Sequence, residues 1–276
     1  MATRSILFLS KGHDAPSTRY RAVAYFPLLR EAGWVPSHMT THRGGFARLR
    51  LLRAAARADV VVVLRKTFTA GFGRLLRRAA KRLIYDFDDA VFVRDSGQPS
   101  ATRMRRFRQT VRLCDQVWAG NRYLAEACAA LNPTVTILPT PVDPVRYDAD
   151  AQKPPGTFDV VWIGSSSTGK YVAEVLPALE RAAMQVAHLR LKLIADFDLP
   201  TQNLTTVTVP WTEQTEAAQL AASHVGIAPL PDDPWTRGKC GLKVLHYMAA
   251  GLAVIASAVG VHQDIVVNGQ TGYLAQ

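Results

Sequence analysis

Short apolar runs alternate with longer amphipathic stretches along the whole chain. The apolar runs are four to six residues long, which is typical of strands buried in a parallel sheet. We predict strands at residues 5–9, 35–39, 59–64, 83–86, 116–119, 135–138, 159–163, 189–194, 205–209, 225–228 and 253–256. Helical periodicity predicts helices at residues 19–32, 47–58, 70–81, 102–114, 123–130, 170–187, 213–223, 242–250 and 263–267. Strands that alternate with such helices form βαβ units.

A Pro- and Gly-rich segment interrupts this alternation near the middle of the chain. Residues 148–156 contain Pro154, Pro155 and Gly156, which neither continue a helix nor fit a central strand. The segment is the candidate linker between residues 1–150 and residues 157–276, each long enough to bury its own core. We therefore predict an α/β protein with two successive Rossmann-like, doubly wound domains. Ligands bind at the carboxyl ends of such strands, so a cleft between the domains is the expected active site.

The composition is that of a folded protein without a membrane span. Hydrophobic residues make up 48% of the 276 positions, and no apolar run approaches the roughly 18 residues that cross a bilayer. Residues 6–9 are too short for a signal peptide core, and Lys11 follows them closely. The three cysteines, Cys114, Cys128 and Cys240, have no metal-site or disulfide spacing. We expect a cytoplasmic protein.

Positive charge is concentrated in one quarter of the chain. The net charge is +11, and residues 43–112 alone hold 18 Lys or Arg against 5 Asp or Glu. Such a segment favours an anionic partner: an acidic membrane surface, a phosphorylated substrate or a nucleic acid. Nucleic acid is the least favoured of these, because no recognition motif and little aromatic interleaving occur. The alternative is a solvated face of Arg-rich helices.

A glycine-rich turn follows the predicted strand at residues 159–163. The run from Gly164 to Lys170 matches GxxxxGK, in which backbone N–H groups and a lysine hold phosphates. Tyr171 stands where a P-loop has a Ser or Thr, whose hydroxyl binds Mg²⁺. Three interpretations stay open here: an anion site without metal, a P-loop NTPase, and an ordinary strand-to-helix turn.

Three carboxylates lie at the end of the predicted strand at residues 83–86. Asp86, Asp88 and Asp89 could exchange protons or bind a metal there. The pattern matches a haloacid-dehalogenase motif only in part, because Ala90 and Val91 follow. Asp86 has a second interpretation as a hydrogen-bonded loop anchor. Asp88 is the candidate catalytic residue.

Two lysines surround the start of the predicted helix at residues 242–250. Gly241 precedes this helix, and Gly251 follows it as a C-terminal signal. Lys239 and Lys243 are four positions apart, so we expect both to face one side of the helix start. A diphosphate there would gain both positive charges and the helix dipole.

The run from residue 238 to residue 274 resembles the donor-binding region of retaining GT-B glycosyltransferases of family 4. Other segments resemble the same family in the same order: STRYR at residues 17–21, YDFDDAVF at 85–92, AGNRYL at 119–124, LPTPVD at 138–143 and WIGS at 162–165. The resemblance covers essentially the whole chain.

The resemblance implies transfer of a sugar from a nucleotide diphosphate sugar to a glycan or lipid-linked acceptor, with retention and without a metal. Basic side chains and a helix N-terminus would neutralise the diphosphate. It implies a donor site built from Gly164, Ser165, Lys170, Trp211, Lys239, Gly241, Lys243 and His246, in which Trp211 borders the nucleobase. It implies an acceptor side built from Arg19, Arg21, Asp86 and Asp89. The basic segment, residues 43–112, would then dock on an anionic membrane.

The chain departs from the family pattern at several positions. Gly238 and His246 stand where relatives commonly carry two glutamates, and Ser165 replaces a frequent arginine. Asp88 aligns roughly with a frequent histidine. The family usually continues with helices beyond the equivalent of Gln276, so we expect a truncated donor domain. A non-catalytic nucleotide- or glycan-binding protein is therefore the second hypothesis.

Overall fold

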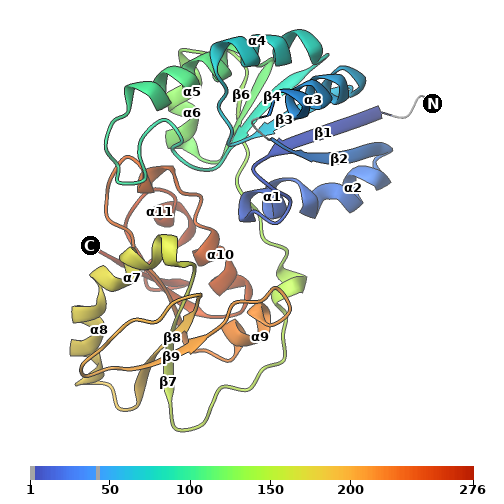
Figure 1. The fold of residues 1–276 in the computed structure, drawn as a ribbon. Helices are drawn as coiled ribbons and strands as arrows, with labels where there is room; N and C mark the ends of the chain where they lie inside the picture. The colour runs from blue at the N-terminus through green and yellow to red at the C-terminus, as the bar shows by residue number, and fades with distance from the viewer. Residues whose placement is uncertain (1–3, 42–43) are drawn as a thin grey trace. The chain divides into compact units, whose positions relative to one another are not determined.

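The computed structural model describes residues 4–41 and 44–276 and contains two six-stranded parallel sheets (Figure 1). The chain divides into two compact units. Unit 1 consists of Met1–Thr140 together with Asp233–Cys240, and unit 2 consists of Pro141–Asp232 and Gly241–Gln276. An α/β protein with two Rossmann-like, doubly wound sheets is thus confirmed. Among the described residues, no helix has the length and apolar character needed to cross a membrane.

Unit 1 is built on a sheet with strand order β2-β1-β3-β4-β5-β6. Its strands are β1 (Arg4–Ser10), β2 (Trp34–Thr40), β3 (Val60–Leu64), β4 (Leu83–Phe87), β5 (Gln116–Ala119) and β6 (Val135–Ile137). Its α-helices are α1 (Pro16–Arg21), α2 (Phe26–Glu31), α3 (Gly45–Arg57), α4 (Ala70–Ala79), α5 (Ala101–Leu113) and α6 (Arg122–Ala129). The short 3₁₀ helices η1 (Val23–Tyr25) and η4 (Thr236–Gly238) complete the unit.

Helices cover both faces of this sheet. Alternate strand residues point to opposite faces, so Leu7 packs with Leu76 of α4 and Phe107 of α5 in one cluster. Phe8 packs instead in a second cluster, with Ile84 and with Phe26 of α2 at its margin. Figure 1 shows α4, α5 and α6 on one side of the sheet and α1 and α2 on the other. The central strands of the sheet are therefore apolar on both faces, as the sequence predicts.

Unit 2 has strand order β12-β11-β10-β7-β8-β9. Its strands are β7 (Phe158–Ile163), β8 (Leu189–Ile194), β9 (Thr205–Val209), β10 (Val225–Ala228), β11 (Ala253–Ser257) and β12 (Gly272–Ala275). Its α-helices are α7 (Gly169–Glu174), α8 (Leu176–Ala183), α9 (Glu216–Ala221), α10 (Leu242–Ala249) and α11 (His262–Ile265). The 3₁₀ helices are η2 (Pro144–Tyr147) and η3 (Ser166–Thr168). Helices α9 and α10 pack on one sheet face, and α7 and α8 pack on the other.

The predicted elements differ from the observed ones at a few places. The single helix expected at residues 19–32 is split into α1, η1 and α2, and Pro27 lies in the first turn of α2. The helix expected at residues 170–187 is likewise split, with Pro177 at the start of α8. Proline lacks a backbone N–H and starts a new helix more readily than it continues one. Strand β12 was not predicted.

The division into units lies away from the Pro- and Gly-rich segment. The first part of unit 1 ends at Thr140, before residues 148–156, which lie in unit 2. Residues 233–240 follow β10 in the sequence but pack with unit 1. No feature of a single sequence reveals such an exchange, because it depends on contacts between residues more than 100 positions apart.

Candidate functional site

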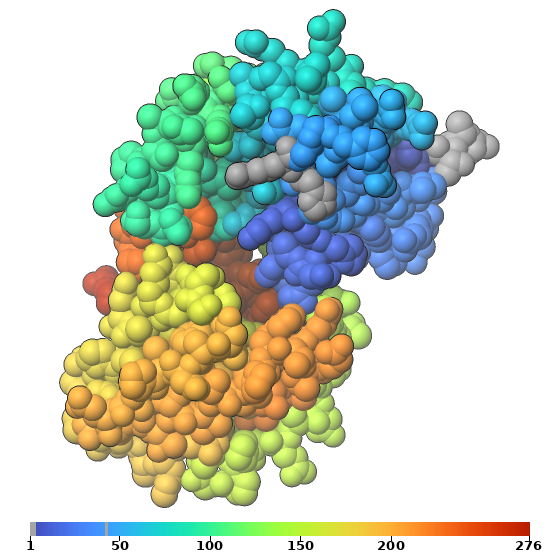
Figure 2. Space-filling model, in the orientation of Figure 1, coloured from blue at the N-terminus to red at the C-terminus, as the bar shows by residue number. Residues whose placement is uncertain are grey.

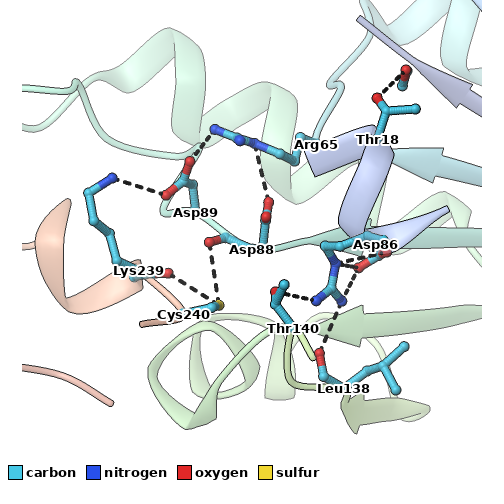
Figure 3. Close-up of polar contacts among 12 residues, drawn as sticks. Thr18, Arg65, Asp86, Asp88, Asp89, Leu138, Thr140, Lys239 and Cys240 are labelled. Atoms are coloured by element: carbon cyan, nitrogen blue, oxygen red, sulfur yellow. Dashed lines mark hydrogen bonds and ion pairs between the residues drawn. The ribbon is translucent and has the colours of Figure 1, made fainter. Parts of the chain in front are cut away.

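A cluster of charged side chains lies at the carboxyl ends of β3 and β4 in unit 1 (Figure 3). Asp86 and Arg21 form its buried part, with only 1% and 5% of each residue exposed. Arg21 Nε donates to Asp86 Oδ1 at 2.8 Å and to Oδ2 at 3.0 Å. The other guanidinium nitrogens donate to Thr140 Oγ1 at 2.9 Å and to the Leu138 carbonyl at 3.0 Å. Arg21 thus ties α1 to the end of β4 and to the chain after β6.

The ionisation of this pair follows from its burial. Burial raises the pKa of Asp86 to about 6, although the charge of Arg21 opposes the rise. Burial also disfavours the charged form of Arg21, but the contacts with Asp86 outweigh it and raise the pKa of the guanidinium. Both groups are therefore charged at neutral pH. This geometry is that of a structural anchor, the second of the two interpretations of Asp86.

Asp88 and Asp89 form the more accessible part of the cluster. Arg65, directly after β3, places Nε 3.3 Å from Asp88 Oδ1 and Nη2 in an ion pair with Asp89 Oδ2. Figure 3 shows the Arg65 guanidinium beside both carboxylates. Burial raises the pKa of Asp88, whereas Arg65 opposes that rise. The candidate catalytic carboxylate therefore has an arginine partner that sequence reasoning missed.

The segment 233–240 brings Lys239 to the same cluster. Lys239 Nζ lies 3.5 Å from Asp89 Oδ1 and 5.2 Å from the centre of the Trp235 ring. Asn121, at the start of α6, donates from Nδ2 to the carbonyls of Arg237 at 3.3 Å and Lys239 at 3.0 Å. Asn121 Oδ1 also accepts from Leu124 N at 2.9 Å, which caps α6. The segment is thus held by side-chain and backbone contacts within unit 1.

The chain approaches itself so closely here that two positions require glycine. A Cβ atom on Gly120 would lie 2.3 Å from Cys240 Sγ. A Cβ atom on Gly238 would lie 2.6 Å from the backbone nitrogen of Ala90. The Cys240 thiol contacts the Asp88 carbonyl at 3.4 Å, and its burial raises its pKa. Position 238 therefore carries no side chain because the loop after β4 fills the space.

A second cluster lies in unit 2, at the carboxyl end of β7. Lys243 Nζ lies 4.7 Å from the centre of the Trp162 ring. A Cβ atom on Gly164 would meet Trp162 at 2.3 Å and Lys243 Nζ at 2.9 Å. Gly169 packs against Phe197, whose ring lies 5.7 Å from that of Trp162. The structure therefore brings Gly164 and Lys243 together, and small residues let the Lys243 ammonium reach the turn.

The turn itself is not arranged as an empty phosphate cradle. Ser166 N and Ser166 Oγ donate to the two carboxylate oxygens of Asp196, at 2.6 and 3.2 Å. Ser165 is exposed, and its hydroxyl pairs with that of Ser167 at 2.8 Å. Lys170 is exposed too, with Nζ 5.0 Å from the Tyr171 ring centre. Asp196 occupies the Ser166 N–H, one of the backbone donors that a P-loop offers to phosphate, which counts against the P-loop alternative.

Lys239 and Lys243 do not lie on one turn of a helix, although they are four positions apart. Gly241 has φ +68°, the left-handed region, and begins α10 there. Lys239 precedes this turn in extended backbone and belongs to unit 1, whereas Lys243 lies inside α10 in unit 2. The spacing of four therefore does not correspond to one helical turn. A Cβ on Gly241 would lie 2.6 Å from Ile265 Cδ1, which is a second reason for glycine there.

His246 and Trp211 are linked through two residues that the sequence did not single out. His246, buried in α10, stacks on Tyr147 with ring centres 5.1 Å apart. Tyr147 Oη donates to one carboxylate oxygen of Glu216, and Trp211 Nε1 donates to the other. Glu216 is 2% exposed, and Trp211 is 39% exposed. One ring face of His246 is thus covered, whereas Trp211 remains accessible at the surface.

Helices α3 and α4 of the basic segment carry exposed arginines on the surface of unit 1. Residue 43 lies outside the described residues. Helices α3 and α4 contact each other and present exposed apolar side chains among their arginines: Phe46, Leu49 and Leu75. Atoms of both helices form part of the face shown in Figure 2. Arg19, on α1, lies 5.4 Å from the Tyr20 ring centre.

Residues 157–276 match the family model described as Glycosyl transferases group 1. The glycosyltransferase resemblance is confirmed. No curated protein has a sequence that matches this chain at a significant level. Among the described residues, no group of three or more His, Cys, Asp or Glu is placed to hold a metal ion. Independence from metals stays a prediction.

Glycosyltransferase structures share the fold over nearly the whole chain. A glycosyltransferase from Rickettsia africae has a TM-score of 0.71 at 13% identity, covering 100% of this chain and 85% of the other. HepE from Anabaena, in complex with UDP-glucose, has a TM-score of 0.67 at 14% identity, covering 99% and 85%. An alpha-glucosyltransferase in complex with UDP and a 13-mer DNA has a TM-score of 0.62 at 11% identity, covering 92% and 79%. The identities are low, so these likenesses establish the fold.

Proposed function

We propose that the chain transfers a sugar from a nucleotide diphosphate sugar to an acceptor hydroxyl. The observation that carries this proposal is the meeting of Lys243, Gly164 and Trp162 at the carboxyl end of β7, within the region that matches the family. An ammonium beside a glycine turn at this edge of a parallel sheet suits a diphosphate. UDP is the first nucleotide to test, because related folds are solved with UDP or UDP-glucose.

Different donor-site residues would bind the diphosphate, the nucleobase and the ribose of the nucleotide. Lys243 and Lys170 would neutralise the diphosphate without a metal, with Gly164, Ser165 and Gly241 allowing close approach. Lys239 would contribute its charge from the segment 233–240. The exposed Trp211 ring offers a flat surface for the nucleobase, and His246, which stacks on Tyr147, would orient the ribose.

The reaction breaks the bond between the anomeric carbon and the diphosphate oxygen. A bond from the same face of that carbon to the acceptor oxygen forms, which retains the configuration, and the hydroxyl proton leaves on the diphosphate. The ionised carboxylate of Asp88 stabilises the positive charge that develops on the sugar, and Asp89 binds a hydroxyl beside it. Arg21 and Asp86 hold the loop, and Arg19 contacts the acceptor.

The acceptor in this proposal is a glycan or a lipid-linked molecule rather than a nucleic acid. Exposed Phe46, Leu49 and Leu75 lie among the arginines of α3 and α4, a combination that suits an anionic membrane surface. The basic segment, residues 43–112, would place the enzyme on the inner face of a membrane. The protein would otherwise be cytoplasmic.

Release of nucleoside diphosphate in the presence of a membrane extract as acceptor source tests the activity. We expect the purified protein to release UDP from one UDP-sugar without added metal, and an Asp88→Asn variant to lose at least 100-fold in rate. Arg181→Met, on the exposed side of α8, is the matched surface control. If a nucleotide sugar binds to the wild-type protein but no nucleoside diphosphate is released, the chain is a nucleotide-binding protein without transferase activity. The departures at Gly238 and His246 point to this second hypothesis.

A further inference from the structure

We propose that Arg65 is a positioning residue that keeps the Asp88 carboxylate ionised and fixed, a role that rests on the proposed transferase function. Arg65 follows β3 directly and belongs to none of the motifs that the sequence singles out. Its contacts, its backbone and the surroundings of Asp88 carry the proposal.

The backbone of Arg65 adopts a conformation that side chains other than glycine rarely take. Its φ is +56°, in the left-handed region, which costs about 1 to 2 kcal/mol for an L-residue. The N–H of Arg65 donates to the Asp86 carbonyl at 2.7 Å. This bond joins the end of β3 to the end of β4. The guanidinium then lies over the loop that carries Asp88 and Asp89 (Figure 3).

The guanidinium of Arg65 contacts both carboxylates at once. Nε lies 3.3 Å from Asp88 Oδ1, and Nη2 pairs with Asp89 Oδ2. Asp88 Oδ1 is buried and accepts no hydrogen bond from the residues that the structure describes. The ion pair with Arg65 is therefore the main interaction that fixes this oxygen. Asp89 in turn contacts Lys239, so Arg65 links the loop after β4 to the segment 233–240.

The titratable and charged groups around Asp88 come from four surrounding elements and from its own loop. They are Arg65 after β3, Asp86 on β4, Arg21 on α1, Cys240 and Lys239 of the segment 233–240, and Asp89 beside Asp88. Burial, Asp86 and Asp89 favour the protonated carboxyl. Arg21 is engaged by Asp86, and Lys239 contacts Asp89. Ionisation of Asp88 consequently depends mainly on Arg65.

The pKa of Asp88 in Arg65 variants tests this coupling without any need for turnover. Carbon-13 NMR titration of the aspartate carboxyls, with Asp88→Asn to assign the signal, gives the pKa directly. We expect Arg65→Met to raise the Asp88 pKa by about 1 to 3 units and Arg65→Lys to restore most of the difference. Arg122→Met, an exposed arginine at the start of α6, is the control and leaves the value unchanged. An Asp88 pKa equal to the wild-type value in a folded neutral variant, Arg65→Met or Arg65→Gln, overturns the proposal.

The pH dependence of sugar transfer then tests whether the coupling serves the reaction. We expect the acid limb of kcat/KM to move to higher pH in Arg65→Met by the amount that the NMR titration gives, with Arg65→Lys in between. An acid limb that stays in place while the Asp88 pKa moves overturns the positioning role. Absence of transfer in the wild type, with the pKa coupling present, counts against the proposed function and leaves the electrostatic coupling established.

Discussion

Gly238 lies against Ala90 so closely that a Cβ atom on Gly238 would be 2.6 Å from the Ala90 nitrogen. The segment that precedes α10 is thus fitted to the loop that carries Asp88 and Asp89. Lys239 and Cys240 follow Gly238 directly and contact Asp89 and the Asp88 carbonyl. Close packing of two backbones here fixes the position of the charged groups on both sides.

A side chain at position 238 should therefore weaken the protein. We expect Gly238→Ala to lower the free energy of unfolding by about 1 to 3 kcal/mol, because backbone atoms must move. Urea denaturation measures this change. Gly71→Ala is the matched control, since nothing lies within 4 Å of that Cβ in α4 and alanine favours a helix. Equal midpoints for Gly238→Ala and the wild type would show that the segment is not tightly fitted.

Glu216 should hold Trp211 in place and stabilise unit 2. Its two oxygens accept hydrogen bonds from Tyr147 Oη and Trp211 Nε1 in a buried position. We expect Glu216→Ala to cost about 2 to 4 kcal/mol, and Glu216→Gln to cost less because one acceptor remains. The fluorescence emission of Trp211 is obtained by subtracting the spectrum of a Trp211→Phe variant. In Glu216→Ala this emission should shift to the red. Unaltered emission with unaltered stability would contradict the assignment.

Asp59 contributes to stability at neutral pH, and this contribution is lost at acid pH. Its carboxylate accepts hydrogen bonds from Ser5 N at 2.8 Å, Ser5 Oγ at 2.9 Å and Lys81 Nζ at 2.8 Å. These contacts hold the pKa of Asp59 well below its usual 3.8, so the stabilisation is complete above that value and is lost as the pH falls below it. Asp59→Asn should be less stable than the wild type at pH 7, with the difference shrinking below about pH 4. A difference that is constant between pH 7 and pH 3 would rule out this linkage.

Exposed arginines of α4 should bind acidic membranes if the basic segment is a docking surface. Arg74 and Arg78 are exposed, whereas Arg77 pairs with Asp115 and supports the end of α4. We expect Arg74→Glu/Arg78→Glu to weaken binding to phosphatidylserine vesicles by at least roughly 30-fold, at about 1 kcal/mol for each lost charge. Arg122→Glu/Arg181→Glu carries the same charge change elsewhere and should bind like the wild type. Equal binding of all three proteins would contradict membrane docking.

The fold could be predicted from the sequence because each strand leaves a local signal. Runs such as residues 60–64 are apolar at every position, and all eleven predicted strands are confirmed. Strand β12 was missed, since its burial alternates and polar residues surround it. The helix breaks at Pro27 and Pro177 could have been predicted, because proline favours the first turn of a new helix.

The site could be predicted only in part, because its geometry depends on contacts distant in sequence. Functional residues are expected after strands and at helix starts, which is where Asp88, Gly164 and Lys243 occur. In the structure, Asp88 lies in a charged cluster, and Lys243 lies beside Gly164. Arg65 has a weak signal, as the first charged residue after β3. The burial of Glu216 has no such signal, because one of its two hydrogen-bond partners, Tyr147, lies 69 positions away.

Binding of nucleotide sugars tests the central claim most directly. A thermal-shift panel of UDP-, GDP- and ADP-sugars, and of ATP with and without Mg²⁺, compares the wild type with Lys243→Met and Arg181→Met. A ligand at 100 times its Kd stabilises by about 2.7 kcal/mol, which raises Tm by several degrees. We predict a shift with one nucleotide sugar that needs no metal, is lost in Lys243→Met and is kept in Arg181→Met. No shift with any nucleotide sugar, or a shift with Mg²⁺-ATP alone, would contradict the account.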